Sequence, residues 1–278
     1  CSSDLERIAN MRVTSIQMEI KDGRKEENIE AALDLLDQAP PSDLILLPEL
    51  WPCGYFSFHR YRKESEPIDG PTVSALRERA SAMGIHILMG SLVLREDDDL
   101  FNAALLLGPD GGIMAQYRKI HLFGYQSEER KLLKAGKKSV VVDLPWGKAG
   151  ITTCYDLRFP ELYRLMVDQG ASIFLVPSAW PLARLDAWRL FNRARAHENL
   201  SYLFSCNCAG TSDGKAFAGH SMIVDPGGEV LAEGGEGACY VSADIDPEQV
   251  RVVRKAFSAL NDRVFLQPNE GYSHGSSL

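Results

Sequence analysis

Three side chains that could perform nucleophilic catalysis stand at the ends of apolar runs. Glu49 follows LILLP, Lys119 lies in YRKIHLF, and Cys154 follows GITT. A free thiol has a pKa of about 8.5, so a working cysteine nucleophile needs a base or positive potential beside it. Taken singly, each residue is better explained as a strand-end acid, a surface cation or a buried thiol. Together they predict a thiol with Glu49 as its base and Lys119 as its cation.

The segment after Cys154 adds a second prediction about this thiol. Its sequence, DLRFPELYRLMV, predicts one helix over residues 156–167. The early amides and the positive dipole end of that helix would face the sulfur. Such a cysteine would be activated and would have an oxyanion pocket nearby.

Composition and charge narrow the functional classes. The chain has 278 residues, of which 45% are hydrophobic and 24% charged, and a formal net charge of -8. This acidic balance disfavours nucleic-acid binding, which relies on a basic surface. No apolar run reaches the ~18 residues of a membrane helix, and the polar N-terminus lacks a signal-peptide pattern. We therefore expect a globular protein that binds neither nucleic acid nor membrane.

The cysteines predict a reducing compartment. Their density and spacing do not match a disulfide scaffold, so we expect a cytoplasmic protein. Cys206 and Cys208 in SCNC occupy alternate strand positions without a second Cys or His pair nearby, and are expected to be small buried side chains.

The elements that must position these residues alternate between strands and helices. The pattern predicts strands over 12–20, 43–48, 85–94, 172–177 and 201–208, and helices over 23–39, 72–83, 183–199 and 246–257. On the helix 183–199, Ala187, Leu190, Phe191 and Ala194 share one face, which is expected to be buried. Residues 105–117 and 222–233 each place Pro, Gly and Asp between apolar runs, which predicts two hairpins.

These elements predict a single α/β domain over residues 11–265. Buried apolar strands need cover on both faces, so layers of helix, sheet, sheet and helix are one arrangement that satisfies them. Residues 1–10 are expected to be an N-terminal extension or an expression remnant, and 266–278 a polar C-terminal tail.

The three motifs, in this order, make the chain resemble the nitrilase superfamily of carbon-nitrogen hydrolases. LLPELWPCGY carries the Glu of that family, YRKIHLF its Lys, and CYDLRFPELYR its Cys. A further family glutamate corresponds to Glu129 in EERKLLKAG rather than to Glu128. The resemblance covers nearly the whole folded chain and implies a four-layer α-β-β-α sandwich that forms a homodimer through the helix after Cys154.

The resemblance also implies roles for these residues. Glu49 would accept the Cys154 proton, and the thiolate would attack an amide carbonyl to form a thioester. Lys119 and the backbone amide of Tyr155 would stabilise the oxyanion, and Glu129 would orient Lys119 or the substrate.

The omega-amidase branch, which acts on small monoamides such as 2-oxoglutaramate, is the branch that the chain resembles most. A distal substrate carboxylate needs a cation, for which Arg158, Arg184 and Arg189 are candidates. Arg158 could equally pair with Asp156 or Glu161. The expected pocket walls are aromatic: Tyr55, Phe123, Tyr155 and Trp180.

The sequence leaves other functions open for the same thiolate and argues against a metal or cofactor site. The same thiolate could attack an N-carbamoyl amino acid or a nitrile, and a thiol redox protein would use an activated cysteine with Cys53 as partner. His197 and Glu198 lack the second His of a zinc site, and His121 is only a minor candidate. No phosphate-binding glycine loop is present, so we expect neither a metal nor another cofactor.

Overall fold

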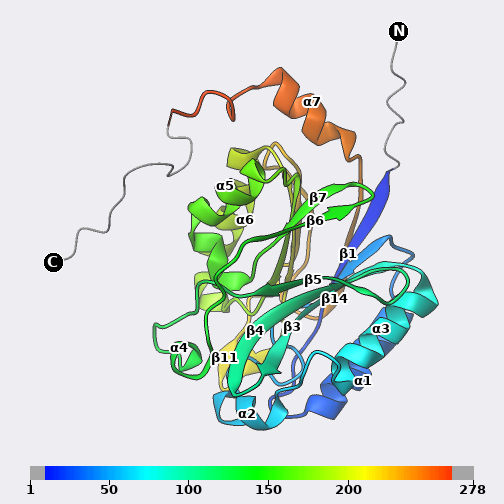
Figure 1. The fold of residues 1–278 in the computed structure, drawn as a ribbon, viewed down its shortest axis with the longest axis vertical. Helices are drawn as coiled ribbons and strands as arrows, with labels where there is room; N and C mark the ends of the chain where they lie inside the picture. The colour runs from blue at the N-terminus through cyan, green and yellow to red at the C-terminus, as the bar shows by residue number, and fades with distance from the viewer. Residues whose placement is uncertain (1–9, 265–278) are drawn as a thin grey trace, which may run out of the picture.

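The computed structural model describes residues 10–264, which form two β-sheets packed face to face between layers of helices (Figure 1). The first sheet has the strand order β14-β1-β2-β3-β4-β5, in which β1, β2 and β3 run parallel. Its strands are β1 (Met11–Gln17), β2 (Leu44–Leu46), β3 (His86–Glu96), β4 (Asp99–Leu107), β5 (Ile113–Arg118) and β14 (Cys239–Ile245).

The second sheet has the order β13-β12-β9-β8-β7-β6, in which β7, β8 and β9 run parallel. Its strands are β6 (Val140–Leu144), β7 (Gly147–Ile151), β8 (Ile173–Ser178), β9 (Tyr202–Asn207), β12 (Met222–Val224) and β13 (Val230–Glu233). A small separate hairpin consists of β10 (Thr211–Ser212) and β11 (Lys215–Ala216).

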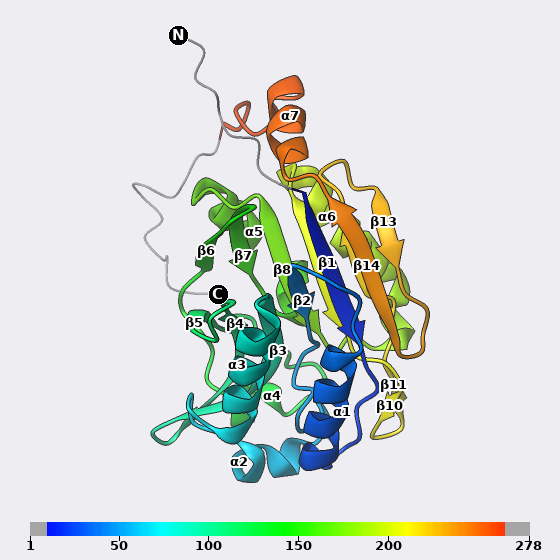
Figure 2. The same ribbon diagram turned by 90° about the vertical axis from the view of Figure 1, so that its right-hand side faces the viewer.

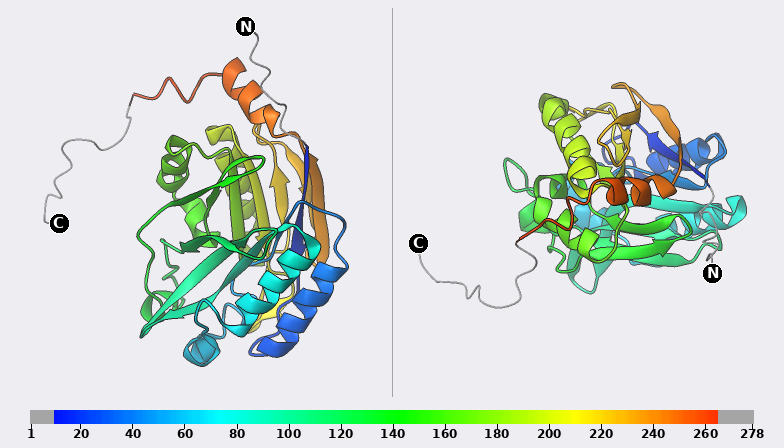
Figure 3. Two further views of the ribbon diagram at one scale, coloured as in Figure 1. Left: turned by 45° about the vertical axis from the view of Figure 1, so that its right-hand side comes forward. Right: turned by 90° about the horizontal axis from the view of Figure 1, so that it is seen from above.

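Helices cover the outer face of each sheet. In Figure 2, α1 and α3 lie side by side against the first sheet, and α5 and α6 lie against the second. Figure 3 shows these layers from two further sides, with α7 (orange) beyond one end of the sheets. The helices are α1 (Lys25–Asp37), α2 (Tyr61–Glu64), α3 (Pro71–Met83), α4 (Glu129–Leu132), α5 (Pro160–Asp168), α6 (Leu185–Asn199) and α7 (Glu248–Ala256). None of the helices within residues 10–264 combines the length and the hydropathy that a membrane-spanning helix requires.

Apolar side chains from both sheets fill the space between them. Val13, Leu44 and Leu88 of the first sheet and Ile151 and Leu175 of the second belong to one buried cluster. Burial of this kind contributes about 25 cal/mol per Å² of apolar surface removed from water, so the cluster holds the two sheets together. The strand ends that carry the predicted site residues therefore extend from a rigid interior.

The predicted four-layer α-β-β-α sandwich is confirmed, and so are both hairpins, which are β4–β5 and β12–β13. The predicted tail 266–278 lies outside the described residues, as does the predicted extension 1–10 apart from Asn10.

The apolar face predicted for α6 is only partly buried. Ala187 and Phe191 on it pack against the buried cluster, whereas Leu190 is 63% exposed. Trp188 and Arg195, which lie outside that face, are buried. The Trp188 indole donates to the His220 carbonyl at 2.6 Å, and Arg195 Nε donates to the Leu157 carbonyl at 2.9 Å. Polar groups can be buried when their hydrogen bonds are satisfied, which a count of apolar residues does not anticipate.

Candidate active site

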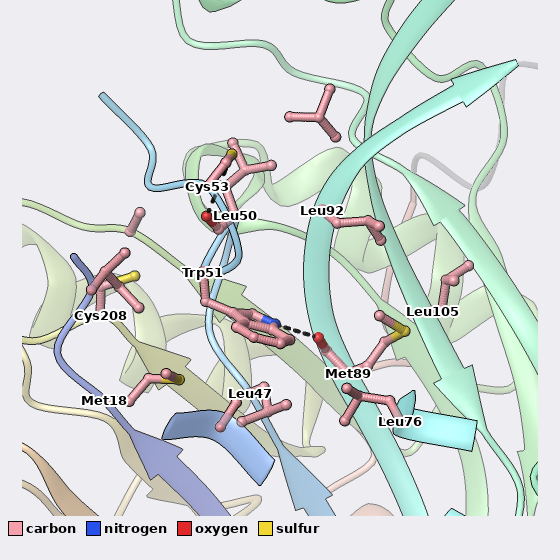
Figure 4. Packing of buried hydrophobic residues seen from close by; sticks show 14 of the residues in the cluster. Met18, Leu47, Leu50, Trp51, Cys53, Leu76, Met89, Leu92, Leu105 and Cys208 are labelled. Carbon is pink, nitrogen blue, oxygen red and sulfur yellow. Dashed lines mark hydrogen bonds between the residues drawn. The ribbon is translucent and has the colours of Figure 1, made fainter. Parts of the chain in front are cut away.

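Glu49 is held by a tight turn at the end of β2. Its neighbours Leu50 and Trp51 are fully buried, and the Trp51 indole donates to the Met89 carbonyl at 2.8 Å (Figure 4). Across the turn, Gly90 has φ +66, and a Cβ there would lie 2.0 Å from the Pro48 carbonyl oxygen. Only glycine allows this approach, so the bulge in β3 helps to fix the backbone at Glu49.

Lys119 directly follows β5, and its ammonium lies between two carboxylates. Lys119 Nζ donates to Glu49 Oε1 at 2.8 Å and to Glu129 Oε1 and Oε2 at 2.9 and 3.1 Å. All three side chains are fully buried. A buried cation between two anions is stabilised only if its donors and their acceptors are closely matched, as they are here.

Glu129 begins the short helix α4 and is held by three further groups. The Phe123 amide donates to its Oε2 at 2.8 Å, the Tyr55 hydroxyl to the same oxygen at 3.1 Å, and Asn102 Nδ2 to its Oε1 at 3.1 Å. The predicted choice of Glu129 over Glu128 agrees with this placement, because Glu128 instead pairs with Lys131 on the surface.

Cys154 follows β7 and has a backbone φ of +48. This left-handed conformation is unfavourable for a residue with a Cβ and costs of order 1–3 kcal/mol. The Asp156 carboxylate fastens the turn, because it accepts from the Thr153 amide at 2.9 Å, the Tyr117 hydroxyl at 2.6 Å and the His121 amide at 3.1 Å. One buried carboxylate thus ties the Cys154 turn to the segment that carries Lys119.

The prediction of one helix over 156–167 is wrong. A 3₁₀ turn spans Cys154–Arg158, and α5 starts separately at Pro160. Phe159 between them has φ -113 and ψ 91, because a residue before proline is pushed away from helical geometry. Cys154 therefore lies within the short 3₁₀ turn and not before the dipole of a long helix.

Burial and charge set the protonation of the central groups. Burial raises the pKa of Glu49, with Lys119 opposing and Glu129 adding to the shift. Burial alone would lower the pKa of Lys119, but Glu129 and Glu49 outweigh it and raise that pKa. Burial and the charge of Glu49 raise the pKa of the Cys154 thiol, and Lys119 opposes them. The raised pKa favours the protonated thiol, and the expected contribution of a long helix dipole to its activation is absent, because Cys154 lies in a 3₁₀ turn.

A pocket opens onto Cys154, and it is lined mainly by aromatic side chains. Its lining residues are Tyr55, Phe56, Phe123, Cys154, Tyr155, Arg158, Ala179, Trp180, Pro181 and Arg184. All four predicted substrate-binding residues, Tyr55, Tyr155, Trp180 and Arg158, are among them. Arg158 and Arg184 are the two charged residues of this lining.

The alternative pairing of Arg158 with Asp156 or Glu161 does not occur. Asp156 is occupied by the donors named above, and Arg158 lies 5.2 Å from the Trp180 ring and 5.0 Å from the Phe191 ring. Arg184 lies 5.3 Å from the Phe123 ring. Within residues 10–264, neither guanidinium makes an ion pair with a carboxylate.

The other candidates lie outside the pocket lining. Arg189 pairs with Glu233 at 2.7 Å, and His121 Nδ1 contacts Asp156 Oδ1 at 2.7 Å while its ring stacks on Phe159. Sequence reasoning missed Phe56 in the pocket wall and Asn102 beside the two glutamates. Neither residue belongs to a motif or a chemically reactive class, so the sequence contains no signal for them.

Three further cysteines of the described residues, Cys53, Cys206 and Cys208, are buried. Cys206 and Cys208 are fully buried, as predicted. Cys53 lies in the cluster outside the first sheet, whereas Cys154 lies in the cluster outside the second. The five cysteines of the described part are all free, so no Cys53–Cys154 pair supports the redox alternative. Over the same range, no group of three or more His, Cys, Asp and Glu side chains could hold a metal ion.

Comparison with known proteins agrees with this geometry. The family described as "Carbon-nitrogen hydrolase" matches residues 12–255. The 2-oxoglutaramate amidase of Paenarthrobacter nicotinovorans is 37% identical over 86% of this chain and 84% of the relative. The 2-oxoglutaramate amidase of Bacillus subtilis is 36% identical over 90% of this chain and 96% of the relative. The crystal structure of Saccharomyces cerevisiae Nit3, a nitrilase-superfamily member, superimposes with a TM-score of 0.83 at 29% identity and covers 97% of this chain and 100% of its own.

Proposed function

The chain belongs to the carbon-nitrogen hydrolase family, and from this premise we propose that it releases ammonia from a small monoamide of a dicarboxylic acid, such as 2-oxoglutaramate. The observation that carries the proposal is the pocket at Cys154, where Arg158 and Arg184 have no carboxylate partner in the described part of the chain. A guanidinium binds a carboxylate through charge-assisted hydrogen bonds, so either could hold the distal acid of such a substrate. Both bacterial relatives named above are called 2-oxoglutaramate amidases.

In the proposed mechanism, Glu49 accepts the thiol proton as the Cys154 sulfur attacks the amide carbon. The carbonyl oxygen becomes an oxyanion, which the Lys119 ammonium and the backbone amide of Tyr155 stabilise. Glu49 returns the proton to the nitrogen, the C–N bond breaks, and ammonia leaves a thioester on Cys154. A water then attacks the thioester with Glu49 again as the base, which releases the acid and restores the thiol.

Glu129 acts on this mechanism through Lys119. It contributes two acceptors to the ammonium, while Glu49 contributes one. Lys119 therefore remains charged and stationary when Glu49 becomes protonated, because Glu129 still compensates its charge.

An ammonia-release panel tests the substrate class. We expect 2-oxoglutaramate and 2-oxosuccinamate to react fastest, and glutamine, an N-carbamoyl amino acid and a simple nitrile to react far more slowly. The reason is that only the first two combine a terminal amide with a carboxylate beside an uncharged 2-oxo group. Glutamine carries an ammonium beside that carboxylate, which the two arginines would repel. Turnover of the nitrile or the carbamoyl compound alone would contradict the proposal.

Variants of the two arginines refine the same test. Arg184→Met or Arg158→Met should raise KM for 2-oxoglutaramate by roughly 10- to 100-fold, the effect of one hydrogen bond to a charged group. KM for butyramide, which has no carboxylate, should be nearly unchanged. Arg189→Met is the matched control, because Arg189 pairs with Glu233 away from the pocket. Equal effects on both substrates would mean that neither arginine binds the acid.

We also propose that the enzyme is a cytoplasmic homodimer that pairs through α5 and α6. Leu165 and Leu190 expose 40% and 63% of their surface on these helices, next to the half-buried Phe191. Sedimentation should therefore give a dimer for the wild-type protein and a monomer for Leu190→Glu, and a wild-type monomer would contradict this assembly.

The free cysteines of the described part support a reducing, cytoplasmic compartment. Cell fractionation can test this location.

A further inference from the structure

Asn102 on β4 contacts three of the four charged or reactive residues of the site, although the mechanism above gives it no role. Its side chain is fully buried. Its Nδ2 donates to Glu49 Oε1 at 2.7 Å and to Glu129 Oε1 at 3.1 Å. Its backbone carbonyl accepts from the Lys119 amide at 2.9 Å.

The orientation of the Asn102 amide is set by the two carboxylates. With Nδ2 toward them, both of its hydrogens are used, one on each glutamate. The reverse orientation would place an amide oxygen against two carboxylate oxygens, all of them acceptors. Asn102 Oδ1 itself is buried and accepts no hydrogen bond within residues 10–264. A buried, unpaired carbonyl is unfavourable, so the position is explained by what Nδ2 does and not by general packing.

The donors of Asn102 complete the coordination of the Glu49 carboxylate. Glu49 Oε1 accepts from Lys119 and Asn102, and Oε2 accepts from the Ala179 amide at 2.9 Å. The carboxylate is thereby held from both ends next to the Cys154 thiol. Of the two side chains that donate to Glu49, Asn102 is the one without a charge, so it fixes the carboxylate without adding a second cation to the site.

From this geometry we infer that Asn102 is a positioning residue that holds the Glu49 carboxylate in its proton-accepting orientation and spaces it from Glu129. The inference rests on the proposed function, because it assigns the purpose of Asn102 to proton transfer from Cys154. Asn102 touches neither the sulfur nor the substrate pocket, so it acts through Glu49.

Asn102→Leu tests the inference, because leucine has a similar shape and no donor. We expect kcat for 2-oxoglutaramate to fall roughly 100-fold, the scale of a small misplacement of a catalytic group, with KM nearly unchanged. The acidic limb of the kcat/KM profile should also move to higher pH. Hydrogen bonds to the charged carboxylate lower its pKa, so their loss raises the pKa of Glu49, and activity disappears at a higher pH as the solution is acidified.

Asn192→Leu is the matched control. Asn192 is a buried asparagine on α6 whose Nδ2 donates to the Trp188 carbonyl at 2.8 Å and whose Oδ1 is also unpaired within residues 10–264. Both variants remove a buried hydrogen bond and should lower thermal stability, but Asn192→Leu should leave the pH profile unchanged. Asn102→Met, with a flexible apolar side chain, provides the same test if Asn102→Leu does not fold.

A wild-type kcat and pH profile in a folded Asn102 variant would overturn the inference. So would an identical pH shift in Asn192→Leu, because the shift would then reflect general loss of stability. Failure of the proposed function is a separate result, since it would appear as wild-type enzyme that releases no ammonia from any amide of the panel.

Discussion

Cys154→Ala is expected to abolish ammonia release, with a loss of at least roughly 10⁵-fold in kcat, the scale at which nucleophiles of catalytic triads fail when removed. Without the sulfur, no thioester can form, and Glu49 and Lys119 have no attacking group to assist. The fold should be retained, because the substitution removes one atom from a turn that Asp156 fastens through other residues. Ammonia release and a thermal melt of the same preparation measure both expectations.

Cys239→Ala is the matched control for this variant, since Cys239 is a half-buried cysteine on β14, outside the pocket lining. It should retain wild-type turnover. Mass spectrometry of wild-type enzyme quenched during turnover should find the acyl group on the peptide that contains Cys154. Substantial turnover by Cys154→Ala, or an acyl group on another cysteine, would refute the mechanism.

Lys119→Met should be less damaging to activity than Cys154→Ala and more damaging to stability. Loss of one positioned oxyanion donor costs about 10²- to 10³-fold in kcat, and a charged donor stands at the upper end of that range. The variant also leaves Glu49 and Glu129 buried without their cation, and breaking a buried ion pair in this way costs about 3–5 kcal/mol. Chemical denaturation at several pH values, with an activity assay, measures both effects.

The stability deficit of Lys119→Met should shrink as the pH falls. Lys119 opposes the raised pKa of Glu49, so its removal raises that pKa further. A carboxyl with a higher pKa in the folded than in the unfolded state binds its proton more tightly when folded. Protonation therefore restores stability as the pH falls through the raised Glu49 pKa toward the ordinary value of 4.5. Lys131→Met removes an exposed ion pair with Glu128 and should show neither the stability deficit nor its pH dependence. A pH-independent deficit would mean that the carboxylates are not the cause.

Much of the fold could be predicted because its elements have local signatures. Apolar runs such as LILLP and SIFLVP became β2 and β8, and the Pro-Asp-Gly and Asp-Pro-Gly-Gly segments became hairpin turns. The two main errors arose where a distant or neighbouring group overrode the pattern. Pro160 divided the predicted helix after Cys154, and the hydrogen-bonded Trp188 and Arg195 are buried although they lie outside the apolar face of α6.

The chemical types at the site follow directly from the order of residues along the chain. Glu49, Lys119 and Cys154 stand in motifs whose order and residue types are specific, and each follows a strand whose end is rigid. These properties depend on covalent neighbours, so they can be read along the chain.

How those groups act on one another depends on the way the chain folds in three dimensions. Asn102 and Phe56 carry no motif, and their roles exist because β4 passes beside β5 and because the loop after Glu49 reaches the pocket. The protonation of Cys154 and the unpaired state of Arg158 depend on burial and on distances between segments remote in the chain. Electrostatic and hydrogen-bonding energies depend on position and exposure in three dimensions. For this reason, the protonation state and the hydrogen-bond partners of these residues cannot be predicted from the sequence.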